Sequence, residues 1–443
     1  METIYLCIVV FLLCLAVFDL FVGVSNDAVN FLNSAIGAKV AKFRTVMIVA
    51  SAGVALGAVM SSGMMDVARH GIMQPSNFTF YDVMTIFLAV MVTDVIVLDM
   101  FNSLGMPTST TVSLVFELLG GTFVIAALKI ATDPSLQFGD LLNTDKALSV
   151  IVAIFVSVAI AFVFGCIVQW ISRIVFTFNY KKHSRYSIAL FGGIAFTSLA
   201  YFIFLKGICK SHYLDDNIRD WVQANTSMLL VYTFIGSSIV MQIFHLLRIN
   251  VFKFVVLMGT FGLAMAFAGN DLVNFIGVPL AGLDSYNDFM ANANGAADTA
   301  FYMDSLNGSA QTPPFYLIAA GVVMIIAMAT SKKARNVIKT SVDLSRQDEG
   351  DEMFGTSRAA RSIVRVTQDT NSWIMQYMPG CIKRWIDSRF NKQEVELEDG
   401  AAFDVVRAAV NLVLASMLIT IGTNFKLPLS TTYVTFMVAM GSS

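Results

Sequence analysis

The sequence predicts an all-α polytopic membrane protein in which two inverted-topology repeats bring broken helices, or half-helices, together near the bilayer midplane. Three observations support this fold class. The chain is 56% hydrophobic and only 14% charged, whereas soluble domains are about 45–50% apolar and about 25% charged. It contains many apolar runs of membrane-spanning length, and it contains two short polar motifs that each occur twice.

The apolar runs define the expected spans, because about 20 apolar residues in a helix cross a bilayer. They lie near residues 4–23, 45–64, 82–100, 107–131, 147–175, 187–206, 227–247, 254–283, 315–331 and 402–422, and another begins near 428. The first run lacks the basic segment of a signal peptide and is followed by further spans, so we interpret it as the first span.

Basic residues predict the orientation, because Lys and Arg accumulate in cytoplasmic loops. They follow spans one, five, seven and nine, all on one side: Lys39, Lys42, Arg44, Lys181, Lys182, Arg185, Arg248, Lys253, Lys332, Lys333 and Arg335. The loops on the other side are acidic, with Asp133, Asp140, Asp145, Asp284, Asp288, Asp298 and Asp304. We therefore expect a multi-pass protein of the cell (inner) membrane with an extracytoplasmic N-terminus.

The composition divides the chain into five segments. We expect transmembrane repeat 1 at 1–131, intervening transmembrane helices at 132–250, the first part of repeat 2 at 251–331, a charged insert at 332–400 and the remainder of repeat 2 at 401–443. The insert is cytoplasmic by the same charge rule and is interpreted as a linker with one or two surface helices. The net charge of −2 and five scattered cysteines indicate neither a nucleic-acid partner nor a cofactor.

The first repeated motif has the spacing N-D-x-x-N-F. It occurs in "GVSNDAVNFLNSAIG" at 23–37 and in "AGNDLVNFIGVPLAG" at 268–282, and it comprises Asn26, Asp27, Asn30, Asn270, Asp271 and Asn274. Asp27 belongs to span one and Asp271 to span eight, an odd number of crossings apart, so the two copies have opposite orientations. Inverted repeats whose broken helices meet near the midplane are typical of secondary transporters.

The second repeated motif is Pro-x-Ser-Thr-Thr, in "PTSTTVSLVFELLGG" from Pro107 and "PLSTTYVTFMVAMGS" from Pro428. A half-helix that starts inside the membrane presents unpaired N–H groups and a partial positive charge, so it suits a small oxyanion. Hydroxyl donors lie at both starts: Ser109, Thr110, Thr111, Ser430, Thr431 and Thr432. Two carboxylates would repel such an anion, and a cation bound to Asp27 and Asp271 resolves this conflict.

Four further acids, Asp19, Asp94, Asp99 and Glu117, lie in apolar runs without a repeat partner. We interpret them as structural or as neighbours of a polar cavity, and we leave them out of the predicted site.

Together the two motif pairs resemble the PiT family of inorganic phosphate transporters, also called phosphate permeases, over residues 20–130 and 250–443. The resemblance implies an inverted-repeat symporter for phosphate with Na⁺ or, in some members, H⁺; a homodimer is compatible with this architecture. It implies a Na⁺ site at Asn26, Asp27, Asn270 and Asp271. Phosphate would contact Asn30 and Asn274 together with Ser109, Thr110, Thr111, Ser430, Thr431 and Thr432.

This chain departs from the family pattern in two places. Many members carry a Glu in the span after the first motif, whereas no acid lies between Val49 and Val59. Family members continue beyond the last half-helix into a further span, so we expect a truncation at Ser443.

Three alternative functions stay open at this point. A sulfate permease of the same architecture would use the same donors. An intramembrane aspartyl protease could use Asp27 and Asp271 as a dyad, although the repeated Ser-Thr-Thr segments would then have no role. A channel is disfavoured because inverted repeats with broken helices favour alternating access. The sequence therefore favours a transporter over an enzyme.

Overall fold

The computed structural model describes residues 2–59, 61, 69, 71–180, 187–201, 215–308, 313–346, 358–390, 397, 400–424 and 429–443. Several predicted features lie outside these residues. They are Pro428, the basic cluster Lys181, Lys182 and Arg185, and parts of the charged insert at 347–357 and 391–396.

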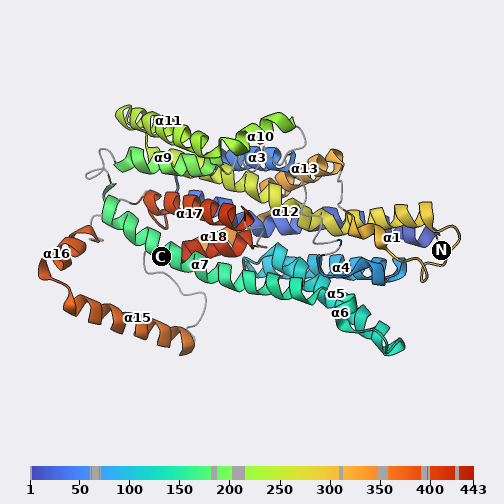
Figure 1. Cartoon of the computed structure of the whole chain (residues 1–443). Coiled ribbons are helices and arrows are strands. Elements are labelled where there is room, and N and C mark those ends of the chain that lie inside the picture. The colour runs from blue at the N-terminus through green and yellow to red at the C-terminus, as the bar shows by residue number, and fades with distance from the viewer. Residues whose placement is uncertain are drawn as a thin grey trace.

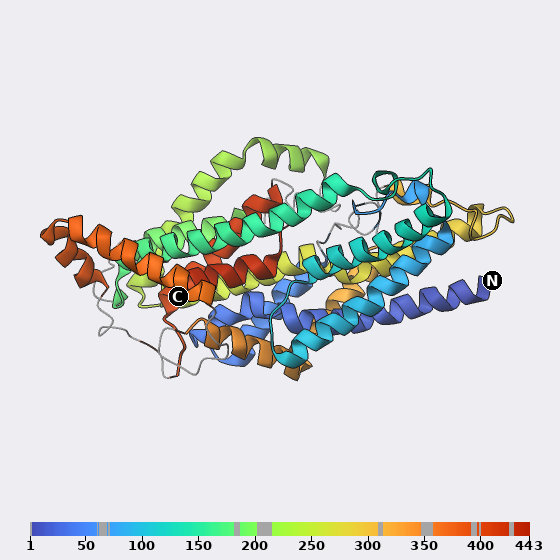
Figure 2. The same ribbon diagram turned by 90° about the horizontal axis from the view of Figure 1, so that it is seen from below.

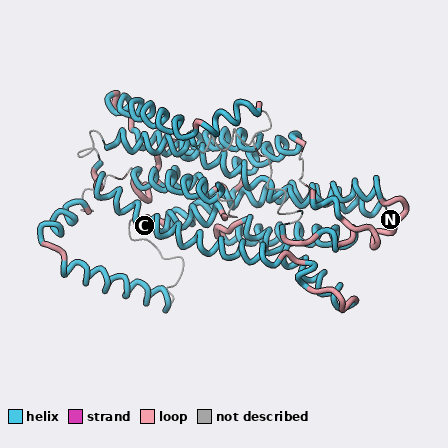
Figure 3. The backbone as a smooth tube through the Cα atoms, viewed as in Figure 1, coloured by secondary structure: helices cyan, strands magenta, loops and turns pink. Residues whose placement is uncertain are grey.

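The described chain is a helical bundle with long, roughly aligned helices (Figures 1 and 3). Within these residues the only β-type pairings are two isolated bridges, Met73 with Leu142 and Thr79 with Tyr302. The elements are α1 (Glu2–Asp27), α2 (Val29–Gly37), α3 (Phe43–Val59), η2 (Pro75–Asn77), α4 (Phe80–Leu104), α5 (Thr110–Thr132), α6 (Phe138–Leu141), α7 (Thr144–Phe176), α9 (Ser187–Ala200), α10 (Asp216–Ala224), α11 (Thr226–Leu246), α12 (Val251–Asn292), η4 (Asp304–Asn307), α13 (Pro314–Thr330), α14 (Lys332–Leu344), α15 (Arg358–Tyr377), α16 (Gly380–Arg389), α17 (Val405–Asn424) and α18 (Thr431–Gly441).

Six helical stretches among the described residues are long and apolar enough to cross a membrane, or seven if α13 and α14 are counted as one span bent by 68°. Three of the other predicted spans correspond to shorter apolar helices, namely α3, α9 and the first part of α17. The helical fold and its membrane-spanning character are therefore confirmed, although fewer full-length spans are found than the sequence predicts.

The surface of α7 shows how the bundle meets lipid. Many of its apolar side chains point outward, and Phe155 is 71% exposed. Its polar side chains Ser157 and Gln169 are buried against the other helices. Water would favour the opposite arrangement, whereas a bilayer solvates apolar side chains and leaves polar groups to pair inside the protein. Seen from below, α7 runs along much of the bundle (Figure 2).

Two helical hairpins, α4 with α5 and α17 with α18, carry the Ser-Thr-Thr segments. In the first, α4 begins at a capping box formed by Thr79 and Asp82 and ends at Gly105, whose φ of 69° is the left-handed conformation that closes helices. After a short turn, α5 begins with Ser109 as its N-cap. In the second hairpin α17 precedes α18, which begins with Ser430 as its N-cap.

The second hairpin is held by a close backbone contact with α7. A Cβ on Gly441 would lie 2.3 Å from the carbonyl oxygen of Phe162, so this position of α18 has no room for a side chain. Small residues allow such close approach between membrane helices. The corresponding Gly120 in α5 has open space around it. The two hairpin helices therefore have different neighbours.

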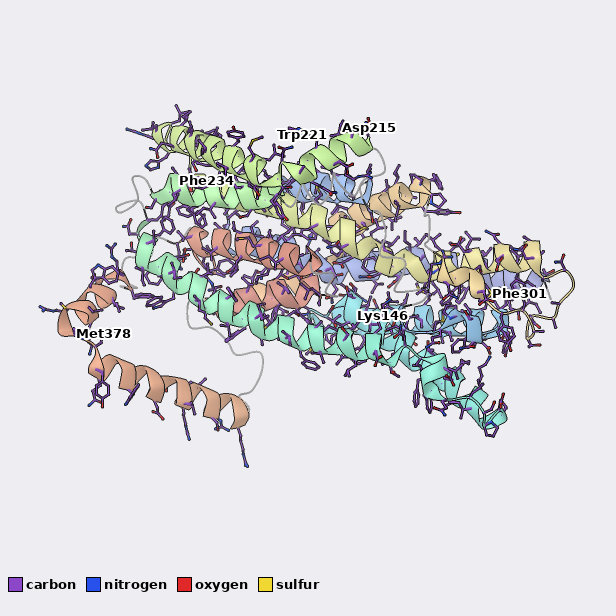
Figure 4. All side chains as sticks on the ribbon, viewed as in Figure 1. Lys146, Asp215, Trp221, Phe234, Phe301 and Met378 are labelled. Atoms are coloured by element: carbon purple, nitrogen blue, oxygen red, sulfur yellow. The ribbon has the colours of Figure 1, made fainter. Side chains whose placement is uncertain are left out.

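The charged insert does not behave as one unit. Its first helix, α14, packs into the bundle, where Val337 and Ile338 are buried and Ser341 accepts a 2.8 Å hydrogen bond from Asn33 of α2. In contrast, α15 stands away from the bundle in Figure 1, and α16 touches α7 at its end, where the rings of Phe390 and Trp170 stack with centroids 6.4 Å apart. Met378 marks the turn between α15 and α16 in Figure 4. The composition change at residue 332 thus precedes the end of the packed region.

Candidate functional site

The two motif aspartates lie where α1 and α12 cross. Four residues before Asp27, Gly23 contacts Phe275, which lies four residues after Asp271; a Cβ on Gly23 would lie 2.1 Å from that ring. Reciprocally, Phe31, four residues after Asp27, packs against Phe267, four residues before Asp271, with ring centroids 5.6 Å apart. The two helices therefore run antiparallel, and the aspartates lie at the centre of their crossing.

The backbone is nearly regular at both aspartates. Between α1 and α2 only Ala28 interrupts the helix, and its φ of −56° and ψ of −24° are still helical. Around Asp271, α12 continues without a break for 42 residues. The helix starts inside the bundle lie instead at the Ser-Thr-Thr segments. The expectation of broken helices thus applies to the second motif and not to the first.

The threonine hydroxyls of both Ser-Thr-Thr segments donate to the two aspartates. Asp27 accepts from Thr110 at 2.8 Å and from Thr432 at 2.9 Å. Asp271 accepts from Thr431 at 2.6 Å and from Thr111 at 3.4 Å. Each carboxylate therefore receives one hydroxyl from each segment, and the four sequence segments meet in a single site.

The asparagines of the first motif extend the same pattern. Asn30 donates to the Thr432 hydroxyl at 2.9 Å, and Asn274 donates to the Thr111 hydroxyl at 2.9 Å. Each asparagine follows its aspartate by three residues, and each threonine is the last residue of its Ser-Thr-Thr segment. The contacts in one half are therefore matched by equivalent contacts in the other.

The starts of α5 and α18 meet beside the aspartates. Ser109 accepts a hydrogen bond from the N–H of Val112, and Ser430 accepts one from Tyr433, so each serine caps its own helix. The Ser430 hydroxyl also donates to the Ser109 hydroxyl at 2.6 Å. Two helix N-termini, each with a partial positive charge, consequently face one another.

Asn26 forms hydrogen bonds with the end of α4 and with the turn that follows it. Its amide nitrogen donates to the Asn102 side chain at 2.8 Å and to the Met106 carbonyl at 3.0 Å, and its oxygen accepts from the Thr108 N–H at 2.7 Å. It thereby holds the turn that leads into α5. The equivalent Asn270 is half-buried one residue before Asp271.

Sequence reasoning missed two contributors to this site. Asn102 binds both Asn26 and the Val22 carbonyl. Thr435 donates to the Asn30 side chain at 3.1 Å. Thr435 lies one helical turn after Thr431, so the i,i+4 spacing was a signal that this hydroxyl shares the face of the motif. Asn102 gave no such signal, because its partner is 76 residues away.

The chemistry of the site is defined by oxygen atoms. Asp27 is fully buried and Asp271 is 4% exposed. Among the described residues no basic side chain pairs with either aspartate, so their charges are balanced only by hydroxyl, amide and helix dipoles. Carboxylate and hydroxyl oxygens are the hard ligands that suit a small cation, while two helix starts suit an oxyanion. A buried site that combines oxygen ligands for a cation with helix N-termini for an anion is typical of a membrane transporter.

Comparisons with known proteins agree with this class. Residues 23–342 match the phosphate transporter family over most of the chain, and the chain belongs to that family. It is therefore a transporter and not an enzyme, which excludes the aspartyl protease alternative. A solved structure described as "The sodium-dependent phosphate transporter" superposes with a TM-score of 0.64 at 17% sequence identity, over 98% of this chain and 89% of that chain. That likeness establishes the fold. A search of curated proteins found no match.

Proposed function

We propose that the protein imports inorganic phosphate by symport with a cation, Na⁺ in preference to H⁺, through alternating access between two inverted repeats. The main support for this proposal is that each buried aspartate accepts a hydrogen bond from a threonine of each Ser-Thr-Thr segment. The antiparallel crossing of α1 and α12 at the aspartates supports the inverted relation of the repeats. The family and the structural relative, which is sodium-dependent by its description, support the substrate and the ion.

Coupling follows from the electrostatics of the site. Phosphate at the starts of α5 and α18 would lie next to two carboxylates, and like charges repel strongly where water is excluded. A cation on Asp27 and Asp271 removes this repulsion. It also frees the threonine hydroxyls, which now donate to the carboxylates, to donate to phosphate. Cation and phosphate therefore stabilise one another in the site, which is the requirement for symport.

Within this proposal Asp27 and Asp271, with Asn26 and Asn270 beside them, bind the cation. Phosphate contacts Asn30 and Asn274 and the hydroxyl groups of both helix starts. Asn26 has two roles in this proposal. It offers a side-chain oxygen to the cation, and its hydrogen bonds hold the turn between α4 and α5 in position. The N-terminus lies outside the cell, as the basic loops indicate.

The test is uptake of radiolabelled phosphate by proteoliposomes that contain the full chain. A Na⁺ gradient and a H⁺ gradient are imposed separately, and ionophores that collapse each gradient serve as controls. We expect concentrative uptake with the Na⁺ gradient and little with the H⁺ gradient. Accumulation that persists when both gradients are collapsed would refute symport.

Selectivity separates phosphate from sulfate, the substrate of the alternative permease. At neutral pH phosphate keeps at least one proton, whereas sulfate has none. Acceptor oxygens of the motif aspartates or asparagines can bind that proton, and an acceptor left unpaired in a dry site costs about 1–3 kcal/mol. Arsenate, which also keeps a proton, should therefore compete with labelled phosphate, and sulfate should compete poorly. Equal inhibition by sulfate would contradict this assignment.

A further inference from the structure

A second group of buried acids lies on α1, α4 and α5, outside the phosphate site. Asp19 is 0% exposed, Asp94 is 1% exposed and Glu117 is half-buried. Asp94 lies beside both of the other two, close enough for its carboxyl group to interact with each of theirs. Ser113 of α5 donates to Glu117 at 2.7 Å. The three carboxyl groups therefore form a continuous chain across three membrane helices.

Most carboxyl oxygens of these three acids have no hydrogen-bond donor among the described residues. Neither carboxyl oxygen of Asp19 has a hydrogen-bond donor among the described residues, and the same is true of one oxygen each of Asp94 and Glu117. Fully buried carboxylates are normally paired or hydrogen-bonded. A hydrogen bond between two carboxyl groups requires a proton on one of them. The contacts among Asp19, Asp94 and Glu117 are thus complete only when protons are bound.

Among the described residues no basic side chain forms an ion pair with Asp19, Asp94 or Glu117. Along α1 the next charged group is Asp27, which is also acidic. The neighbouring α12 carries Asp271 and Asp284, and Arg69 pairs with Asp284 at 2.9 Å. On α5, Lys129 pairs with Asp82 at 2.6 Å. On α14, Lys333 pairs with Asp99 at 2.6 Å, at the exposed end of α4. Three adjacent carboxylates inside a membrane protein repel one another and lose their hydration, so at least one of them must be neutralised.

A groove of about 510 Å³ between α4 and α5 reaches this chain of acids. Glu117 and Ser113 line it, and so do Thr108 and Ser109 at the tip of the α4–α5 hairpin. Glu117 is accordingly the acid through which we expect protons to enter from the groove, and Asp19 is the most deeply buried of the three. The groove also joins the acids to the helix start that belongs to the phosphate site.

We propose that Asp19, Asp94 and Glu117 form a proton-binding site, separate from the aspartates of the phosphate site and loaded through the groove between α4 and α5. A proton fits better than a metal ion, because adjacent carboxyl groups can share a proton and then stabilise rather than repel one another. The linear order of the three carboxyl groups suits shared protons, with Asp94 in the middle. Proton binding here does not depend on phosphate transport, so it can be tested alone.

Infrared difference spectroscopy of the purified full chain in phosphate-free lipid membranes gives a direct readout. Protonated carboxyl groups have a C=O stretching band that carboxylates lack. We expect this band at neutral pH, and we expect it to disappear at alkaline pH. Glu117→Gln and Asp94→Asn should each remove part of the band, and Asp99→Asn, the matched control on the exposed end of α4, should leave it unchanged. Glu117→Gln is the mildest change, since glutamine can still accept from Ser113.

Two results would overturn the proposal. One is a band of wild-type intensity in a folded Glu117→Gln or Asp94→Asn variant, with folding checked by gel filtration and thermal unfolding. The other is a band that Na⁺ removes at constant pH in the wild type and that has no such response in Glu117→Gln, which would make this a sodium site. Neither result bears on Asp27 and Asp271, so the proposed function would stand or fall separately.

Discussion

The regions around Asp27 and Asp271 carry the same hydrogen bonds on different scaffolds. Both aspartates accept hydroxyls from the two Ser-Thr-Thr segments, and Asn30 and Asn274 make equivalent contacts. Yet the helices that carry the threonines pack differently: Gly441 of α18 lies against the Phe162 carbonyl of α7, whereas Gly120 of α5 has open space around it. The polar contacts that face the ligand match between the halves, and the packing that supports them differs. Substitutions in the polar contacts should therefore have equal effects in both halves, and substitutions in the supporting packing should not.

The largest difference is expected at the first asparagine of the motif. Asn26→Ala leaves the Asn102 side chain, the Met106 carbonyl and the Thr108 N–H without a buried partner, and each such group costs about 1–3 kcal/mol. We expect a loss of about 3 kcal/mol or more in the free energy of unfolding, seen as a lower melting temperature in detergent. Asn270→Ala should lower the melting temperature much less. Equal losses in both variants would mean that the two scaffolds are equivalent.

Gly23→Ala tests the helix crossing itself. The added methyl group would lie 2.1 Å from the Phe275 ring, so this buried ring or the two helices must shift. Overpacking of this kind costs about 1–3 kcal/mol, and displaced aspartates should also slow phosphate uptake. Gly236→Ala on α11, where a Cβ meets nothing within 4 Å, is the matched control and should preserve both properties. A Gly23→Ala variant with wild-type stability and uptake would argue against the close crossing.

The threonines test the equivalence of the polar contacts. Thr110→Val and Thr431→Val keep the side-chain shape and remove one donor to a charged ligand. Each should weaken phosphate affinity by about 1.5–3 kcal/mol, or about 10- to 150-fold, because the backbone N–H groups remain. Thr85→Val, at an exposed position on α4, is the control. If neither variant changes phosphate affinity in uptake assays, the Ser-Thr-Thr segments serve helix packing only.

The smallest effect is expected at Thr435, which supports Asn30 but has no counterpart, since the equivalent position in α5 is Leu114. Thr435→Val removes one hydrogen bond between neutral groups, worth about 0.5–1.5 kcal/mol. Phosphate affinity should therefore fall less than about tenfold. A loss larger than that of Thr432→Val would place Thr435 in direct contact with the ligand and make the two halves less alike.

Much of this comparison could be predicted from the sequence, because repeated motifs show themselves within one chain. The helical membrane fold follows from apolar length, and the grouping of Asp27, Asp271 and the threonines follows from the two motif pairs. Contacts without a repeated pattern could not be predicted. Asn102 gave no sequence signal for its contact with Asn26, and the chain of Asp19, Asp94 and Glu117 comes from three helices without a shared motif. The packing of α14 against the bundle could not be predicted either, because the helix is rich in charged residues and only one of its faces is apolar.

The most direct test of the central claim is sodium-driven phosphate accumulation by Asp27→Asn and Asp271→Asn in proteoliposomes. Asparagine keeps the size of each side chain and removes the charge that holds the cation, so each variant should lose concentrative uptake. Asp99→Asn, which changes an exposed carboxylate paired with Lys333 on the bundle surface, should accumulate phosphate like the wild type. Accumulation at the wild-type level by either Asp27→Asn or Asp271→Asn would contradict the account.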